Sequence, residues 1–162
     1  MIVKSCFIIF SLLSLANRIH SWPSGAPEKT CSTLLPRHGG TPAKEAQEAP
    51  YTVEQSASTY QPGDQVKVVL KSPTNTSFKG LLIQAVDPES GKTIGTFSEG
   101  KGLKLLDSCS SVTHSDNRNK RSATLVWNAP KSAPGSVIFR ATVVQKYDTF
   151  YRGLISTLNQ NA

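Results

Sequence analysis

The sequence of 162 residues is poor in the side chains that most often carry catalysis, with only three histidines and three cysteines. It contains no Gly-x-Ser-x-Gly nucleophile motif, no glycine-rich phosphate-binding loop and no His-Glu-x-x-His zinc motif. Nucleophilic, phosphate-binding and metal-dependent sites depend on such residues at fixed spacing. We therefore expect a protein that is not an enzyme and that needs no cofactor or metal ion.

The chain also lacks an apolar run of the ~20 residues that a membrane-spanning helix needs. Its longest apolar stretch, from Cys6 to Ala16, is broken only by serines, follows the positively charged Lys4 and precedes a turn-prone segment at 22–25. This order is typical of a signal peptide, with a membrane anchor as the alternative. We predict that residues 1–21 are removed and that residues 22–162 form a single secreted, extracellular domain that does not span a membrane.

Cysteine is scarce, and removal of the signal peptide takes Cys6 away. Cys31 and Cys109 then remain as the only possible intrachain pair in an oxidising compartment, so we predict a disulfide between them. Together with His38 and His114, the same two cysteines could instead form a tetrahedral zinc site. Secretion and the lack of a Cys-x-x-Cys pair favour the disulfide, with both histidines hydrogen-bonded to loop backbone near the bridge.

Acidic residues are outnumbered, because the expected mature chain has 16 basic and 11 acidic residues, a formal charge of +5. A basic secreted domain is attracted to anionic surfaces. The densest basic cluster is Arg118, Lys120 and Arg121, and guanidinium groups bind phosphate in a bidentate geometry. These three residues are a candidate ligand site, with a solvated loop as the alternative. The chain shows no module with base-stacking aromatics, so we expect no nucleic acid partner.

Alternation of apolar and polar residues is the main structural signal that the sequence does contain. It runs from Ala123 to Trp127 and resumes from Val137 to Val143, with the period of strands that have one buried face. Two prolines and a glycine separate these runs and require a turn. We expect the two runs to form a hairpin at the centre of an antiparallel sheet, with Trp127 in the core.

Further short strands are expected around this hairpin, and the one at 78–86 is apolar on both faces. Residues 22–50 show no sustained period and are expected to form an extended arm that Cys31 fixes to the domain. The whole pattern predicts an all-β, immunoglobulin-like antiparallel β-sandwich with one disulfide. The remaining expected strands cover residues 51–56, 65–71, 93–97, 103–106 and 147–158.

The order of several short motifs resembles the reeler domain and, within that family, the small secreted insect defense proteins. The motifs lie along nearly the whole expected mature chain, at residues 25–27, 36–39, 50–51, 60–64, 78–85, 113–114, 127–130 and 135–143, with Cys31 and Cys109 among them. The resemblance implies an immunoglobulin-like sandwich with a Cys31–Cys109 disulfide and a role in the response to infection. It brings no active-site motif.

We therefore expect a secreted, monomeric innate-immune protein with an antibacterial role, in the hemolymph if the source is an insect. Its expected partners are microbial surface polyanions, such as lipopolysaccharide and lipoteichoic acid, or glycans. An extracellular matrix or cell-surface adhesion module that binds host protein or glycan is the alternative. Asn75-Thr76-Ser77 is an N-glycosylation sequon and predicts modification of Asn75.

Overall fold

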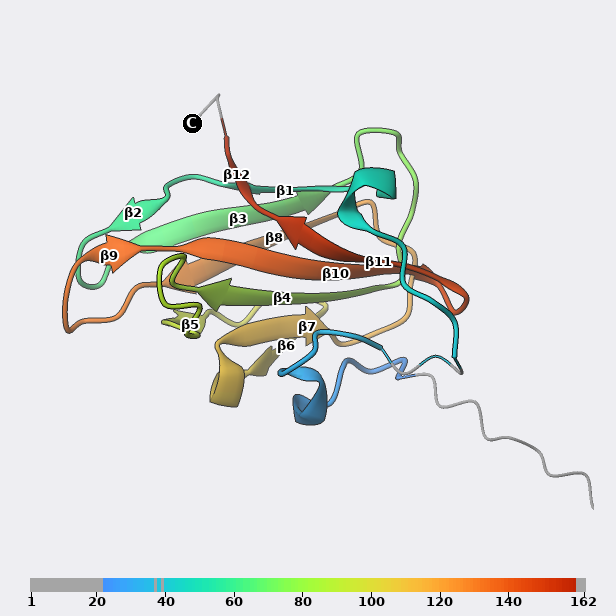
Figure 1. Ribbon diagram of the computed structural model, residues 1–162, viewed down its shortest axis with the longest axis horizontal. Helices are drawn as coiled ribbons and strands as arrows, with labels where there is room; N and C mark the ends of the chain where they lie inside the picture. Colours follow the sequence, from blue (N-terminus) through green and yellow to red (C-terminus); the bar gives the residue numbers. More distant parts are fainter. Residues whose placement is uncertain (1–21, 37, 39, 160–162) are drawn as a thin grey trace, which may run out of the picture.

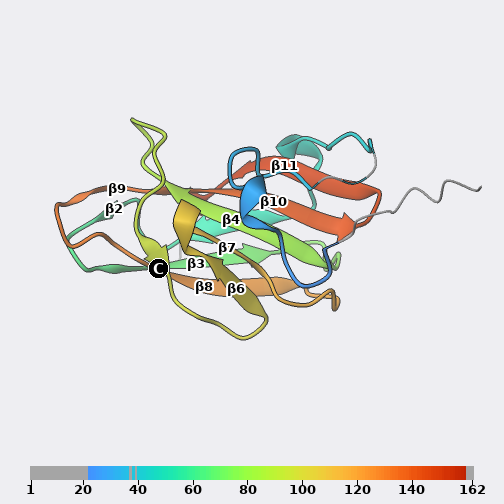
Figure 2. The same ribbon diagram turned by 90° about the horizontal axis from the view of Figure 1, so that it is seen from below.

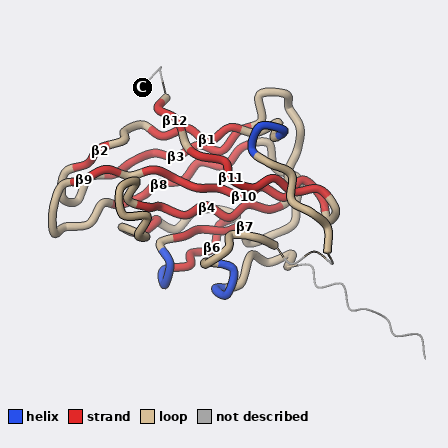
Figure 3. Tube along the Cα trace, viewed as in Figure 1, coloured by secondary structure: helices blue, strands red, loops and turns tan. Residues whose placement is uncertain are grey.

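The computed structural model describes residues 22–36, 38 and 40–159, and the expected signal peptide at 1–21 lies outside them. Two five-stranded sheets pack face to face (Figure 1). Apart from three 3-10 turns, the described chain is strand and loop (Figure 3). The turns are η1 (Glu28–Thr30), η2 (Ala46–Glu48) and η3 (Asp107–Cys109). The predicted all-β sandwich is confirmed.

Sheet I has the strand order β12-β1-β3-β8-β5. Its neighbours are antiparallel except for β12, which runs parallel to β1. In this sheet Val66, Val68 and Leu70 point into the core while Lys67 and Lys71 point outward, as the alternation predicts. The bounds are β1 (Thr52–Gln55), β3 (Gln65–Lys71), β5 (Thr96–Phe97), β8 (Ser122–Asn128) and β12 (Thr157–Leu158).

Sheet II has the order β11-β10-β4-β7-β6 and is antiparallel throughout. Every residue of β4 is buried, which confirms the prediction of a strand covered on two faces. A small third sheet joins β2 (Thr59–Tyr60) to β9 (Gly135–Ser136). The other bounds are β4 (Gly80–Val86), β6 (Leu103–Leu106), β7 (Ser111–His114), β10 (Ile138–Lys146) and β11 (Thr149–Ile155).

The expected hairpin of residues 123–144 is wrong in its pairing. Trp127 on β8 and Phe139 on β10 belong to opposite sheets and meet edge to face across the core, with ring centroids 5.9 Å apart. The segment that connects the two strands is hydrogen-bonded to residues 58–64 and not across a hairpin. Ala129 N–H donates to the Asp64 carbonyl, and Val137 N–H donates to the Ser58 carbonyl. Alternation identifies the residues that face a core, but it is the same for strands of either sheet.

The expected strand at 93–97 is also divided between the two sheets. Thr93 forms a single bridge with Val86 of sheet II, whereas Thr96 and Phe97 pair with β8 of sheet I. Gly95 lies between them with a φ of +63°, and a Cβ at this position would collide with the Trp127 ring. Only glycine therefore allows the chain to change sheets so close to the largest core side chain.

The described part of the arm, residues 22–36, 38 and 40–50, covers part of the outer face of sheet II (Figures 1 and 2). Cys31 and Cys109 are bonded as predicted, and the backbone N–H of Ala26 donates to Thr113. Leu34 packs on a small apolar cluster that contains Leu82. The arm then crosses the end of the sandwich, where Lys44 bridges β11. This layer is what buries the second face of β4.

Candidate functional site

The basic cluster predicted from the sequence lies in the loop of residues 115–121 between β7 and β8. Asp116 accepts from Arg118 Nη2 at 2.7 Å and from Lys120 Nζ at 2.8 Å. The hydrogen bond from the Arg118 side chain and that from Lys120 hold the pKa of Asp116 well below its usual range. The loop therefore carries one ionised carboxylate, Asp116, that is paired with two of its three cations, Arg118 and Lys120.

The three cations have different roles in this geometry. Lys120 Nζ lies 2.8 Å from the Asp116 carbonyl and 2.9 Å from the Arg118 carbonyl, and its side chain is only 15% exposed. Lys120 thus holds the loop together and offers little charge to a ligand. The Arg118 side chain is 76% exposed, and Arg121 is also exposed. The structure brings the predicted residues together but leaves the two arginines as the accessible ones.

A hollow of about 410 Å³ adjoins this loop and adds Lys101 from the turn before β6. The turn and the loop are joined by a hydrogen bond from Ser115 N–H to the Gly102 carbonyl. Ser122 and Thr124 contribute hydroxyls from β8. Sequence reasoning missed Lys101, because no local pattern reveals that residues 101 and 118 face the same hollow.

A second cavity, of about 190 Å³, lies between the arm and the outer face of sheet II. Its walls are mostly apolar on the arm side, while β4, β10 and the residues next to them supply both apolar and basic groups. Sequence reasoning missed this cavity, since it depends on where the arm lies. Its lining comprises Trp22, Pro23, Ala26, Thr30, Leu34–Pro36, His38, Lys79–Leu82, His114, Asn117, Thr142, Val144, Lys146 and Tyr147.

His114 joins the arm to β4 within this cavity. Its Nδ1 accepts from the Leu81 backbone N–H at 3.2 Å, and its Nε2 donates to the Trp22 carbonyl at 3.2 Å. Burial lowers the pKa of His114. The ring lies so close to Gly80 that a Cβ there would come within 2.9 Å of it. His114 is therefore a neutral, structural histidine that is bonded to nearby backbone.

His38 lines the same cavity, but its hydrogen bonding differs from that of His114. Its ring stacks on Tyr147 with centroids 4.7 Å apart, and the residue is 7% exposed. Burial lowers its pKa, against a backbone hydrogen bond with Tyr147 that raises it. Nδ1 is buried and has no hydrogen-bond partner within the described chain. A buried polar atom without a partner is costly unless a ligand or water satisfies it.

The zinc alternative does not fit this arrangement. Its two thiols are joined in the disulfide, and within residues 22–36, 38 and 40–159 no group of three His, Cys, Asp or Glu side chains could hold a metal ion. Asn75, the predicted glycosylation site, is exposed in the loop between β3 and β4 and has a positive φ of +61°. Its modification stays a prediction.

The comparison with protein families matches the reeler domain over residues 29–161. The chain belongs to the reeler domain family. A crystal structure of the human F-spondin reeler domain is similar in fold, with a TM-score of 0.56 and 24% identity over 80% of this chain and 92% of that one. At this identity the likeness concerns the fold alone.

Two relatives show how the domain occurs in longer and shorter proteins. A Bombyx mori protein named "Putative defense protein" is 32% identical, over 93% of this chain and 92% of its own length. "Ferric-chelate reductase 1" of Bos taurus is 35% identical over 88% of this chain, which spans 24% of that protein. The chain thus spans about a quarter of the reductases it matches. Within the described residues, no helix is long and apolar enough to cross a membrane.

Proposed function

We propose that this protein is a secreted innate-immune factor that binds anionic groups of microbial surfaces through the loop at 115–121 and Lys101. The observation that carries the proposal is the exposure of Arg118 beside a hollow that Lys101, Ser122 and Thr124 also line, with Arg121 exposed in the same loop. Among the described residues, the Arg118 guanidinium pairs only with Asp116. Ion pairs near the surface are weak enough for a phosphate to compete with the carboxylate.

The ligand class follows from the chemistry of these groups. Guanidinium forks bind phosphate in a bidentate geometry, and lipopolysaccharide and lipoteichoic acid present phosphates on an extended surface. Binding of this kind weakens as salt screens the charges. The similarity to a relative of nearly the same length that is named a defense protein supports the immune role. Reductase activity is named for proteins of which this chain spans about a quarter, and we do not propose it here.

Secretion is part of the same proposal. It is supported by the apolar leader predicted at 1–21, by the Cys31–Cys109 disulfide and by the exposed sequon at Asn75. Disulfides persist in oxidising compartments and are rare in the cytosol.

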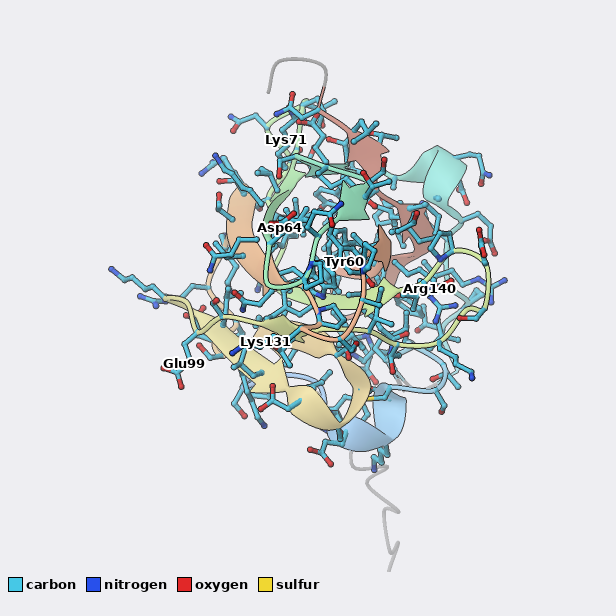
Figure 4. The ribbon with its side chains drawn as sticks, turned by 90° about the vertical axis from the view of Figure 1, so that its left-hand side faces the viewer. Tyr60, Asp64, Lys71, Glu99, Lys131 and Arg140 are labelled. Carbon is cyan, nitrogen blue, oxygen red and sulfur yellow. A yellow bond between two sulfur atoms is a disulfide. The ribbon has the colours of Figure 1, made fainter. Side chains whose placement is uncertain are left out.

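A salt-series binding assay on live Gram-negative bacteria, Gram-positive bacteria and yeast tests the proposal. The test variant is Arg118→Gln/Arg121→Gln, which leaves Lys120 in place so that the loop keeps its internal hydrogen bonds. The matched control is Lys92→Gln/Lys131→Gln, which removes the same charge from exposed positions. Lys131 lies at the end of the sandwich that Figure 4 faces, beyond the end of β8 opposite to the loop.

We expect binding that falls with salt and falls in the arginine variant about tenfold relative to the control, as for the loss of two charge-assisted contacts. Equal binding by the two variants would remove the loop from the proposal. Salt-resistant binding to host cells or host glycans, with none to microbes, would establish the adhesion alternative instead.

A further inference from the structure

The cavity under the arm has a basic end and an apolar end. In the register of β4 and β10, Gly80 pairs with Val144 and Leu82 pairs with Thr142. These two residue pairs define two successive levels along the cavity, the first at Gly80 and the second at Leu82. Lys79, Lys146 and Tyr147 adjoin the first level. At the second level Leu82 belongs to the apolar cluster on which Leu34 of the arm packs, and both residues line the cavity. The cavity is therefore amphipathic along its length.

The basic end has charge that is available to a ligand. Lys79 is exposed, and within the described chain its ammonium has no ion-pair or hydrogen-bond partner. Among the residues that the structure describes, Lys146 forms an ion pair only with Asp148, at 3.2 Å, and both side chains are about 60% exposed. Exposed ion pairs contribute little to stability. An anion at this end of the cavity can therefore bind both lysines, and breaking the Lys146–Asp148 pair costs little free energy.

His38 provides a second, independent sign of a missing partner. Its Nδ1 is buried without a hydrogen bond, the residue lines the cavity, and it stacks on Tyr147 beside Lys146. Nδ1 itself is shielded from solvent, so a ligand head group beside the two lysines satisfies this nitrogen only after the His38 ring turns toward the cavity.

The size of the cavity limits what can enter. An apolar protein cavity of about 150 Å³ holds a benzene molecule. The cavity under the arm, at about 190 Å³, is therefore large enough for a ring or for a stretch of a single acyl chain, but not for several chains together.

We propose that this cavity binds one acyl chain that carries an anionic head group, with the chain on Leu34 and Leu82 and the head group at Lys79, Lys146 and His38. The inference goes beyond the proposed function, since it concerns the cavity under the arm and not the hollow beside Lys101. The same chemistry is present in a free fatty acid and in a single-chain phospholipid.

Calorimetric titration of the protein secreted from cells that express the full chain tests this proposal. The probes are saturated fatty acids of increasing length, the matching alcohols, and lysophosphatidylglycerol, all below their micelle concentrations. We expect one site, a gain in affinity of about fourfold per CH₂ until the cavity is filled, and weaker binding of the alcohols. Binding of the carboxylates alone indicates a fatty acid ligand, and binding of the lysolipid alone indicates a phosphate head group. The absence of saturable binding by every anionic probe overturns the proposal.

Two variants separate a binding role from a structural one. Lys79→Gln/Lys146→Gln should lower affinity about tenfold relative to the matched control Lys92→Gln/Lys131→Gln. His38→Phe keeps a ring on Tyr147 and removes the unpartnered nitrogen. It should weaken binding several-fold without lowering the melting temperature. Unchanged affinity in the lysine variant overturns the head-group assignment, whatever His38→Phe shows.

Discussion

The two sheets of the sandwich differ in what covers their outer faces. On sheet I, the outward side chains of β3 and β8 face solvent, with Lys71 paired to Glu54 at 2.7 Å. On sheet II, the arm is fastened over β4 and β7 by the disulfide and by hydrogen bonds from Ala26 and Gln84. A face open to water needs only polar side chains, whereas a covered face can enclose a cavity. The cavity under the arm is accordingly found on sheet II.

The largest test of this difference is removal of the disulfide with Cys31→Ser/Cys109→Ser. The bridge spans a sequence separation of 78 residues, and loop-closure entropy predicts a loss of about 4–5 kcal/mol in the free energy of unfolding. Urea unfolding followed by tryptophan fluorescence measures it. Reduction of the unmodified protein is the control and should give a similar loss. A change below about 1 kcal/mol would mean that non-covalent contacts hold the arm.

The second test compares one apolar side chain on each outer face. Leu82→Ala, under the arm, should lower the free energy of unfolding by about 2–5 kcal/mol, because a buried leucine leaves a cavity. Val69→Ala, on the outer face of β3, should lower it by less than about 1 kcal/mol, because Val69 is only half-buried. Equal losses in urea unfolding would show that the outer face of sheet I is also covered in solution.

The third test concerns the loop at 115–121, where one cation, Lys120, is enclosed and another, Arg118, is exposed. Lys120→Met removes the donor to two loop carbonyls and to Asp116, and should cost about 1–3 kcal/mol. Arg118→Gln removes only an exposed pair and should cost no more than about 0.5 kcal/mol. Thermal unfolding of both variants measures the contrast. The reverse order would make Arg118, and not Lys120, the residue that holds the loop.

Much of the sandwich could be predicted from the sequence because its signals are local. Alternation gave the inward faces of β1, β3 and β8, and cysteine scarcity gave the disulfide. The assignment of β8 and β10 to one hairpin failed because the choice of sheet depends on contacts with residues 58–64, which are distant in sequence. Pairing is a long-range property that no short window contains.

The candidate sites were less predictable for the same reason. The sequence identified the cluster of Arg118, Lys120 and Arg121, but it could not show that Lys120 is enclosed by loop carbonyls. The cavity needs an arm residue, His38, next to Tyr147 near the other end of the chain. Such sites arise only after the arm has been placed on sheet II.

The smallest expected effect is the dependence of stability on pH. It arises from the two histidines at the covered outer face of sheet II. Within the described residues both histidines, His38 and His114, line the cavity under the arm, and burial lowers the pKa of each below 6.5. The unfolded chain therefore takes up protons first as the pH falls, so stability is complete above about pH 6.5 and declines toward pH 5. The acidic groups with lowered pKa values, Asp87, Asp116 and Asp148, lose their contribution only below about pH 4, outside this window. Urea unfolding at pH 7.5 and pH 5 measures the decline, and His38→Phe should reduce it. A flat profile between these values would mean that the arm opens enough to hydrate both rings.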